Sequence, residues 1–204
     1  MPALPKLVRE MTGTLGPKVR EAYLLAARIH QGEKRKSGEP YITHPLAVAK
    51  ILFEAGADED IVCAALLHDT LEYNDDAENV AGKIHAQFGD QVLYLVQAVS
   101  KDATISDKKQ QQKQYVEQIR HALEVDIFAF FIKVADLLHN ISTISGLTGK
   151  RREQWIHELK YQYLPIFSDC FHRVPLSYRE MYYHMIEAIE QIISSLEENS
   201  HHGE

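Results

Sequence analysis

The 204-residue sequence has only two cysteines, Cys63 and Cys170, and no apolar run approaches the roughly 20 residues needed to cross a bilayer. Two cysteines give no sign of an oxidising compartment, and Cys63 stands in the apolar run 61–67, which indicates a buried thiol. The first 16 residues lack the apolar centre of a signal peptide. These absences predict a cytoplasmic protein that does not associate with a membrane.

The chain is also short of positive charge. Its 29 acidic residues outnumber its 22 lysines and arginines, which gives a formal net charge of −7. This balance argues against binding to nucleic acid or to an anionic membrane, because both require a positive face. An anionic small molecule can still bind where basic residues cluster, as they do at 34–36. The oligomeric state is left open, a homo-oligomer included.

Apolar residues recur with a period near 3.6 along most of the chain, which favours helices. We expect helices over 17–31, 43–54, 58–67, 78–88, 90–99, 115–123, 127–144, 151–171 and 177–196. The run 61–67 is apolar almost all round, which predicts a central, buried helix. Segment 101–113 has few apolar anchors, and we expect a mobile connection or a frayed helix start there; whether it covers the site is left open. Without repeats or a domain-scale linker, the pattern predicts a single all-α domain over 1–204 with a frayed tail at 197–204.

Local signals mark several helix boundaries. Thr43 and Asp58 are good N-cap residues for the helices that follow them. Ser177 with Glu180 three residues later has the spacing of a capping box. Pro165 predicts a kink or break near residue 164, because proline cannot continue a helix without losing a hydrogen bond.

Three short segments carry side chains that could together hold one divalent metal ion. They contribute His44, the pair His68 and Asp69, and Asp136, and the last two segments are otherwise apolar. A charged carboxylate in such surroundings is costly unless it is paired or bound to a metal. A His-Asp dipeptide alone more often marks a helix end with a solvent-facing aspartate. Here Glu72 follows at helical spacing, so the three side chains can share one face if the helix continues.

Imidazole and carboxylate ligands together suit manganese, iron, zinc or nickel better than calcium. Such an ion can polarise a phosphoryl oxygen and lower the pKa of a bound water molecule. Glu72 is placed to orient or deprotonate that water. Arg35 in the basic cluster could bind a phosphate through two hydrogen bonds or stack on a purine. The residues therefore predict a phosphohydrolase.

Four blocks strongly resemble the hydrolase domain of RelA/SpoT-type proteins, a branch of the HD-domain superfamily: 32–45, 64–72, 88–89 followed by 99–101, and 133–140. The similarity extends over about 22–143. No large synthetase or regulatory region follows, so the chain looks like a stand-alone small alarmone hydrolase.

This resemblance implies an all-helical HD-domain bundle that hydrolyses (p)ppGpp, the nucleotide of the stringent response. Water attack would release pyrophosphate from the 3′ position and give GDP or GTP. The implied ligands of a manganese ion are His44, His68, Asp69 and Asp136. The implied contacts to the guanine nucleotide are Arg35, Lys36, Ser37, Asn140 and Thr143.

The sequence departs from the family pattern beside the site. Tyr73 stands where the family has an aspartate after the glutamate, and Leu137 and Ser142 stand where it usually has arginines. Loss of one acid–base carboxylate can cost roughly 10²–10⁴-fold in rate. Two alternatives therefore remain: a phosphatase for another nucleotide, such as NADPH or a deoxynucleotide, and a catalytically weakened, nucleotide-binding regulatory module.

Overall fold

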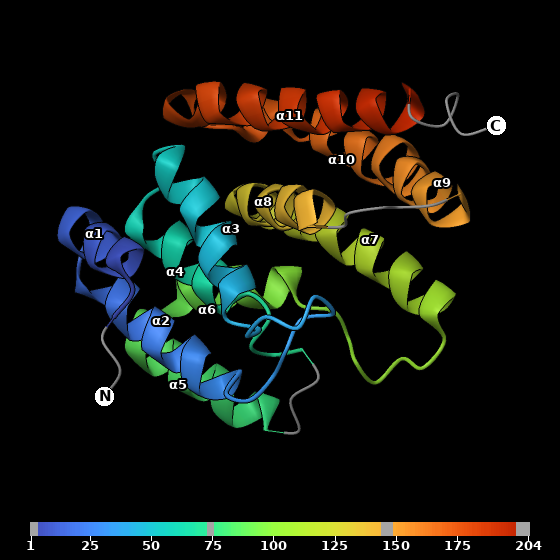
Figure 1. Ribbon diagram of the computed structural model, residues 1–204. Coiled ribbons are helices and arrows are strands. Elements are labelled where there is room, and N and C mark those ends of the chain that lie inside the picture. The colour runs from blue at the N-terminus through green and yellow to red at the C-terminus, as the bar shows by residue number, and fades with distance from the viewer. Residues whose placement is uncertain (1–3, 73–75, 144–148, 199–204) are drawn as a thin grey trace. The chain divides into compact units, whose positions relative to one another are not determined.

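The computed structural model describes residues 4–72, 76–143 and 149–198, and within them the regular structure is helical, without a β-strand (Figure 1). The α-helices are α1 (Lys6–Leu15), α2 (Pro17–Ile29), α3 (Thr43–Glu54), α4 (Glu59–Leu67), α5 (Ala77–Phe88), α6 (Asp90–Val99), α7 (Lys108–Val125), α8 (Phe128–Thr143), α9 (Gly149–His157), α10 (Leu164–Asp169) and α11 (Arg179–Glu198). A π-helical turn, η1 (Glu158–Tyr163), precedes α10, and two 3₁₀ turns, η2 (Phe171–Arg173) and η3 (Leu176–Tyr178), precede α11. The predicted all-α class is confirmed.

The chain forms two compact units, residues 1–118 and residues 119–204. Helix α7 runs from the first unit into the second. Among the residues that the structure describes, no helix is both long enough and apolar enough to span a membrane.

Helix α4 is the centre of the first unit. It packs against α2, α3 and α6, and every side chain from Ile61 to Leu67 is buried. Asp58 begins the helix as predicted, since its carboxylate accepts a hydrogen bond from the backbone N–H of Ile61 at 3.1 Å. The expectation of a central, buried helix is therefore confirmed, and Cys63 is fully buried within it.

The second unit is organised around the aromatic side chains of α8. The ring of Phe130 lies 5.1 Å from Phe167 of α10 and 4.8 Å from Tyr182 of α11, measured between centroids. Such edge-on and tilted pairs add to the stabilisation that burial provides. Within the apolar run 127–132, residues 128–132 form the first turns of α8, which confirms the expected helix.

Pro165 interrupts the helical path as predicted. It occupies the first turn of α10, where a missing N–H is tolerated. Because proline cannot donate to the carbonyl four residues earlier, the preceding turn cannot close as a regular α-helix. The chain widens there into the π-helical turn η1.

Two predicted helix caps do not form as expected. Thr43 is the first residue of α3 rather than its cap, and its hydroxyl donates to the carbonyl of Pro40 at 2.8 Å. Ser177 lies inside η3, and α11 begins only at Arg179, so the capping box does not form the start of that helix. In both cases a turn just before the helix supplies the local hydrogen bonds.

Two further boundaries differ from the sequence prediction. Helix α1 was not predicted, although it buries Val8 and Met11. The weak segment 101–113 contains the beginning of α7, where the carboxylate of Asp107 accepts hydrogen bonds from the backbone N–H groups of Lys109 and Gln110 at 2.9 Å. The helix start is therefore capped rather than frayed.

Candidate metal and phosphate site

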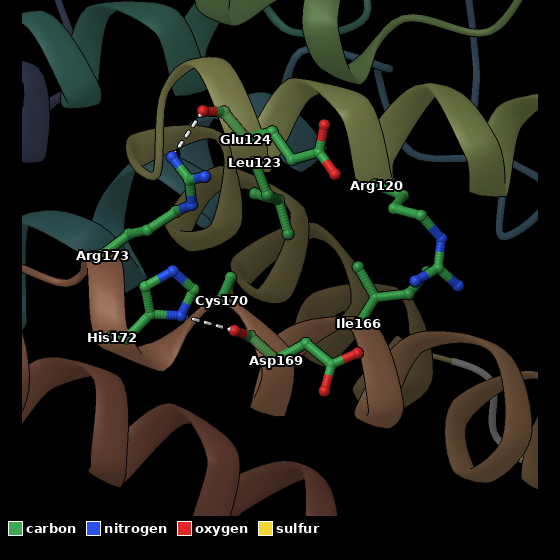
Figure 2. A pocket seen from close by; sticks show the side chains of 8 residues that line it. All are labelled: Arg120, Leu123, Glu124, Ile166, Asp169, Cys170, His172 and Arg173. Atoms are coloured by element: carbon green, nitrogen blue, oxygen red, sulfur yellow. Dashed lines mark hydrogen bonds between the residues drawn. The ribbon is translucent and has the colours of Figure 1, made fainter.

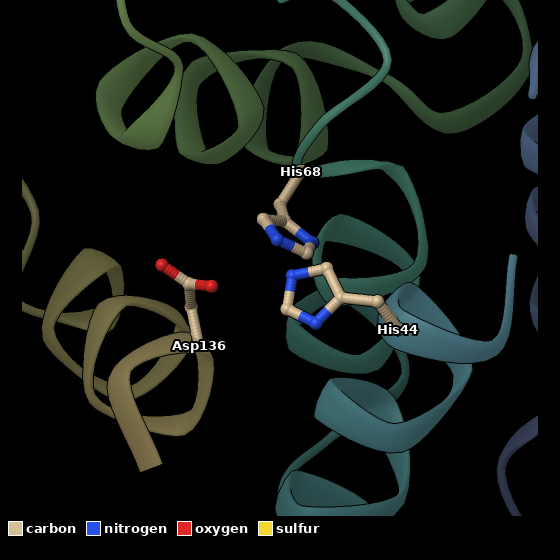
Figure 3. A group of neighbouring side chains, drawn as sticks. All are labelled: His44, His68 and Asp136. Carbon is tan, nitrogen blue, oxygen red and sulfur yellow. The ribbon is translucent and has the colours of Figure 1, made fainter. Parts of the chain in front are cut away.

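His44 and His68 meet in the interior of the first unit. His44 lies in the first turn of α3 and His68 directly follows α4, and each is 2% exposed. Their ring centroids are 5.0 Å apart and the ring planes are inclined by 68°. Figure 3 shows the two imidazole rings beside each other. A ring nitrogen of each lies within 4.8 Å of the other. The two predicted imidazole ligands are thus brought together by two helices that pack on each other.

Asp69 reaches this pair from a turn and not from a helix. Helix α4 ends at Leu67, and the backbone N–H of Glu72 donates to the carbonyl of Asp69 at 3.1 Å. The condition that the helix continue to Glu72 is therefore not met. The turn nevertheless places one carboxylate oxygen of Asp69 3.2 Å from Nε2 of His68 and the other 3.4 Å from Nε2 of His44.

The tautomer of His68 supports a cation at this point. Its Nδ1 lies 2.8 Å from the backbone carbonyl of Ala65, which can only accept, so Nδ1 carries the hydrogen. In the neutral ring, Nε2 then presents a lone pair towards the Asp69 carboxylate. Two such atoms at this distance are stabilised by a shared cation, either a proton or a metal ion. The arrangement fits a divalent metal.

Glu72 lies next to these side chains and is held by the segment before α7. Its carboxylate accepts a hydrogen bond from the backbone N–H of Lys101 at 2.7 Å. The hydroxyl of Ser100 donates to the carbonyl of Val96 at 2.7 Å and lies 3.2 Å from the carbonyl oxygen of His68, so the same segment also contacts the turn there. Burial raises the pKa of Glu72 above its usual value, and the charge of Asp69 raises it further. A carboxylate of this kind is a suitable proton acceptor.

Asp136 lies on α8 in the second unit, and side chains of the same helix hold its carboxylate. One oxygen is 3.0 Å from Nζ of Lys133, and the other accepts a hydrogen bond from the side-chain amide of Asn140. Lys133 is itself buried at 3% exposure, so its charge is neutralised locally. The carboxylate of Asp136 is thus oriented by side chains of its own helix, and a carboxylate is a ligand that divalent metal ions accept.

The predicted nucleotide contacts lie in two places. The loop before α3 is closed by a bridge between Lys34 and Pro40 and by a hydrogen bond from the backbone of Arg35 to that of Glu39 at 2.9 Å. Gly38 has a positive φ of 91°, which permits the tight turn. Within the loop Arg35 is half-buried, while Lys36 and Ser37 are exposed.

Asn140 and Thr143 occupy the last turns of α8. The amide of Asn140 donates to Asp136, and the hydroxyl of Thr143 is within 3.1 Å of the carbonyls of His139 and Asn140. Of the departures from the family pattern, Leu137 is buried at 2% exposure and Ser142 bonds to the backbone of His139. Tyr73 lies outside the described residues.

Two residues around the site were missed by the sequence analysis. Tyr41 donates a hydrogen bond from its hydroxyl to Asp69 at 2.8 Å, across 28 residues of sequence, and no local pattern announces it. Burial raises the pKa of Tyr41, and the charge of Asp69 raises it further, so the hydroxyl keeps its hydrogen. Lys133 could have been found, because a lysine three residues before an aspartate on a helix is a recognised pairing.

A separate pocket of about 200 Å³ lies in the second unit. Figure 2 shows its lining: two arginines and two acidic residues, with His172, Cys170 and two aliphatic side chains. Arg173 donates to the backbone carbonyl of Glu124 at 2.7 Å and so caps the end of α7. The described lining includes none of the predicted site residues, and its charges balance.

The chain matches the sequence model of the HD domain over residues 22–169, a span that runs through both units. It is 39% identical over 159 residues to the bifunctional (p)ppGpp synthase/hydrolase SpoT of Escherichia coli, covering 77% of this chain and 22% of that protein. It is 37% identical over 149 residues to the guanosine-3′,5′-bis(diphosphate) 3′-pyrophosphohydrolase of Aquifex aeolicus, covering 73% of this chain and 21% of that protein. The chain thus spans about a fifth of the length of these curated relatives.

Among solved structures, the chain resembles one described as a metazoan ortholog of SpoT that hydrolyses ppGpp, with a TM-score of 0.69 and 25% identity. The match covers 88% of this chain and 96% of that one. The fold and the histidine–carboxylate cluster define an all-α protein with a candidate metal site. The chain belongs to the HD domain family.

Proposed function

We propose that this protein is a manganese-dependent hydrolase of (p)ppGpp that removes the 3′-pyrophosphate and leaves GDP or GTP. The observation that carries the proposal is the contact of the Asp69 carboxylate with both buried imidazoles, beside the half-buried Glu72. The (p)ppGpp hydrolysis after which its relatives are named supports the same substrate. Action in the cytoplasm and self-association both stay predictions.

The proposed ligands of the manganese ion are His44, His68, Asp69 and Asp136. When bound, the ion would polarise a phosphoryl oxygen and lower the pKa of a water molecule. The carboxylate of Asp136 is held ready by Lys133 and Asn140, which limits its reorientation.

Glu72 is proposed to take the proton of the attacking water. The water oxygen bonds to the phosphorus attached to the 3′ oxygen, the bond between that phosphorus and the 3′ oxygen breaks, and the 3′ oxygen takes up a proton. Pyrophosphate leaves with the oxygen of the water. The hydrogen bond from Lys101 keeps the Glu72 carboxylate in place during this transfer.

The loop at 34–37 is proposed to bind the anionic nucleotide. Arg35 is half-buried, so its guanidinium is less hydrated and suited to a bidentate phosphate contact or to stacking on guanine. Lys36 and Ser37 are exposed and would complete this contact. Asn140 and Thr143 are proposed to contact the nucleotide from the end of α8.

The test is to incubate the purified protein with Mn²⁺ and a panel of (p)ppGpp, NADPH and deoxynucleotides, and to separate the products by ion exchange. We expect pyrophosphate together with GDP or GTP. His68→Ala and Asp69→Ala should lose both Mn²⁺ binding and hydrolysis. His85→Ala is the control, because this histidine is exposed in the same unit. Full activity in either site variant would overturn the assignment.

The same assay separates the alternatives. Phosphate release from NADPH or a deoxynucleotide, without turnover of (p)ppGpp, would replace the proposed substrate. Binding of metal and nucleotide without turnover would indicate a regulatory module. Tyr73→Asp then measures how much the missing carboxylate limits the reaction, since a large gain in rate would show that the natural chain is attenuated.

A further inference from the structure

Two backbone hydrogen bonds and one ring contact fix Tyr41, in addition to the hydrogen bond from its hydroxyl to Asp69. Its backbone N–H donates to the carbonyl of Glu33 at 3.0 Å, and its carbonyl accepts from the N–H of His44 at 2.9 Å. Its ring packs on that of His30, with 4.7 Å between centroids. The backbone position of Tyr41 is therefore fixed by the loop on one side and by the start of α3 on the other.

His30, on which the Tyr41 ring packs, is itself fixed in position. The residue is 7% exposed, and its Nδ1 lies 2.8 Å from the carboxylate of Glu33. The backbone N–H of Glu33 also donates a hydrogen bond to the carbonyl of His30 at 3.1 Å. Two hydrogen bonds therefore connect these residues at the start of the basic loop. A ring that is buried and bonded in this way has little freedom to turn.

The hydroxyl of Tyr41 can donate one hydrogen, and it donates it to Asp69. The accepting oxygen is the one that lies 3.4 Å from Nε2 of His44. With that oxygen engaged, the carboxylate cannot rotate freely, and its other oxygen stays 3.2 Å from Nε2 of His68. A tyrosine from a loop outside α4 thus sets the orientation of a carboxylate that lies on a turn.

We propose that Tyr41 is a positioning residue for the metal site: its hydroxyl orients Asp69 and so preorganises the site for a divalent cation. This inference rests on the proposed function, because it takes Asp69 as a ligand. Tyr41 does not touch the reacting atoms in this role. It acts through Asp69, and it links the basic loop to the metal site because it is anchored in both.

The test is the affinity for Mn²⁺, measured by isothermal titration calorimetry with purified Tyr41→Phe protein. The substitution removes one oxygen and keeps the ring on His30, so the fold is retained. Removing such a hydrogen bond to a metal ligand typically weakens metal affinity by roughly 10–100-fold, and we expect a loss in that range. At saturating Mn²⁺ kcat should recover towards the wild-type value, which loss of structure would not allow.

Tyr182→Phe is the matched control. Its hydroxyl is buried and also donates at 2.8 Å, but to the backbone carbonyl of Phe167, so its loss should leave Mn²⁺ affinity unchanged. Equal Mn²⁺ affinity in Tyr41→Phe and wild type would overturn the role of Tyr41 and leave the proposed function standing. Failure of the wild-type protein to bind Mn²⁺ would instead overturn the proposed metal site itself.

Discussion

Replacing Lys133 by methionine removes a buried charge and keeps most of the volume of the side chain. Lys133 is 3% exposed, and its ammonium lies 3.0 Å from the carboxylate of Asp136 and 5.3 Å from the centre of the Tyr163 ring. At the 3.0 Å between the Lys133 ammonium and the Asp136 carboxylate, the two charges attract by about 5.5 kcal/mol for an effective dielectric constant of roughly 20. Part of this attraction only offsets the cost of burying the lysine.

What remains after the substitution is a carboxylate without its cation. Removing one partner of a buried pair costs about 3–5 kcal/mol. The lower end applies here, because the Asp136 side chain is 15% exposed and keeps the hydrogen bond from Asn140. We therefore expect a loss of about 3 kcal/mol in the free energy of unfolding, which lowers Tm by about 6–12 °C for a chain of this size.

The assay is thermal unfolding followed by circular dichroism, first with EDTA and then with excess Mn²⁺. If Asp136 is a ligand, the bound ion supplies the missing positive charge, so Mn²⁺ should narrow the difference in Tm between Lys133→Met and wild type. Lys160→Met is the control, because Lys160 pairs with Glu197 on the surface, and its Tm should stay at the wild-type value. An unchanged Tm for metal-free Lys133→Met would refute the energetic argument, and a gap that Mn²⁺ does not narrow would refute Asp136 as a ligand.

Three further outcomes are expected. Glu72→Gln should keep its Mn²⁺ affinity but lose roughly 10²–10⁴-fold in kcat, and a loss of Mn²⁺ binding in calorimetry would mean that Glu72 is itself a ligand. Asp58→Ala should lower the free energy of unfolding by about 1 kcal/mol in urea denaturation, because it removes the cap of α4, whereas Asp58→Asn, which can still cap, should not. Burial raises the pKa of the Cys170 thiol from 9.0 to about 12, so the thiol ionises at lower pH in the unfolded chain than in the folded one. The free energy of unfolding should therefore fall as the pH rises from 9 towards 12. An equally steep fall in Cys170→Ala would mean that other groups cause the pH dependence.

Much of the fold follows from local patterns. The apolar run 61–67 predicts the buried helix α4, Asp58 predicts its start, and Pro165 predicts the break before α10. Each of these signals acts within a few residues, where spacing and backbone chemistry decide the outcome. Helix α1 was not predicted because it buries only two side chains, Val8 and Met11, and these are too few among polar residues to show a helical period.

The candidate site was predicted as a set of residues and not as an arrangement. His44, His68, Asp69 and Glu72 stood out by residue type and by the family resemblance. The spacing would place Glu72 on one helical face with His68 and Asp69 if the helix continued, but the helix ends at Leu67. Spacing alone could not show this, because helix termination there depends on the hydrogen bonds that the turn makes with its surroundings.

The sequence by itself determined the all-α class, the buried central helix and the identity of the candidate ligands, because periodicity and residue type are local properties of the chain. Only the tertiary structure decided that a turn brings Asp69 to both imidazoles, and that the hydroxyl of Tyr41 reaches Asp69 from 28 residues away. Only the structure, likewise, shows Lys133 buried against Asp136. These contacts depend on which helices pack together and on how much water the packing excludes, and neither is specified by the residues immediately around each side chain.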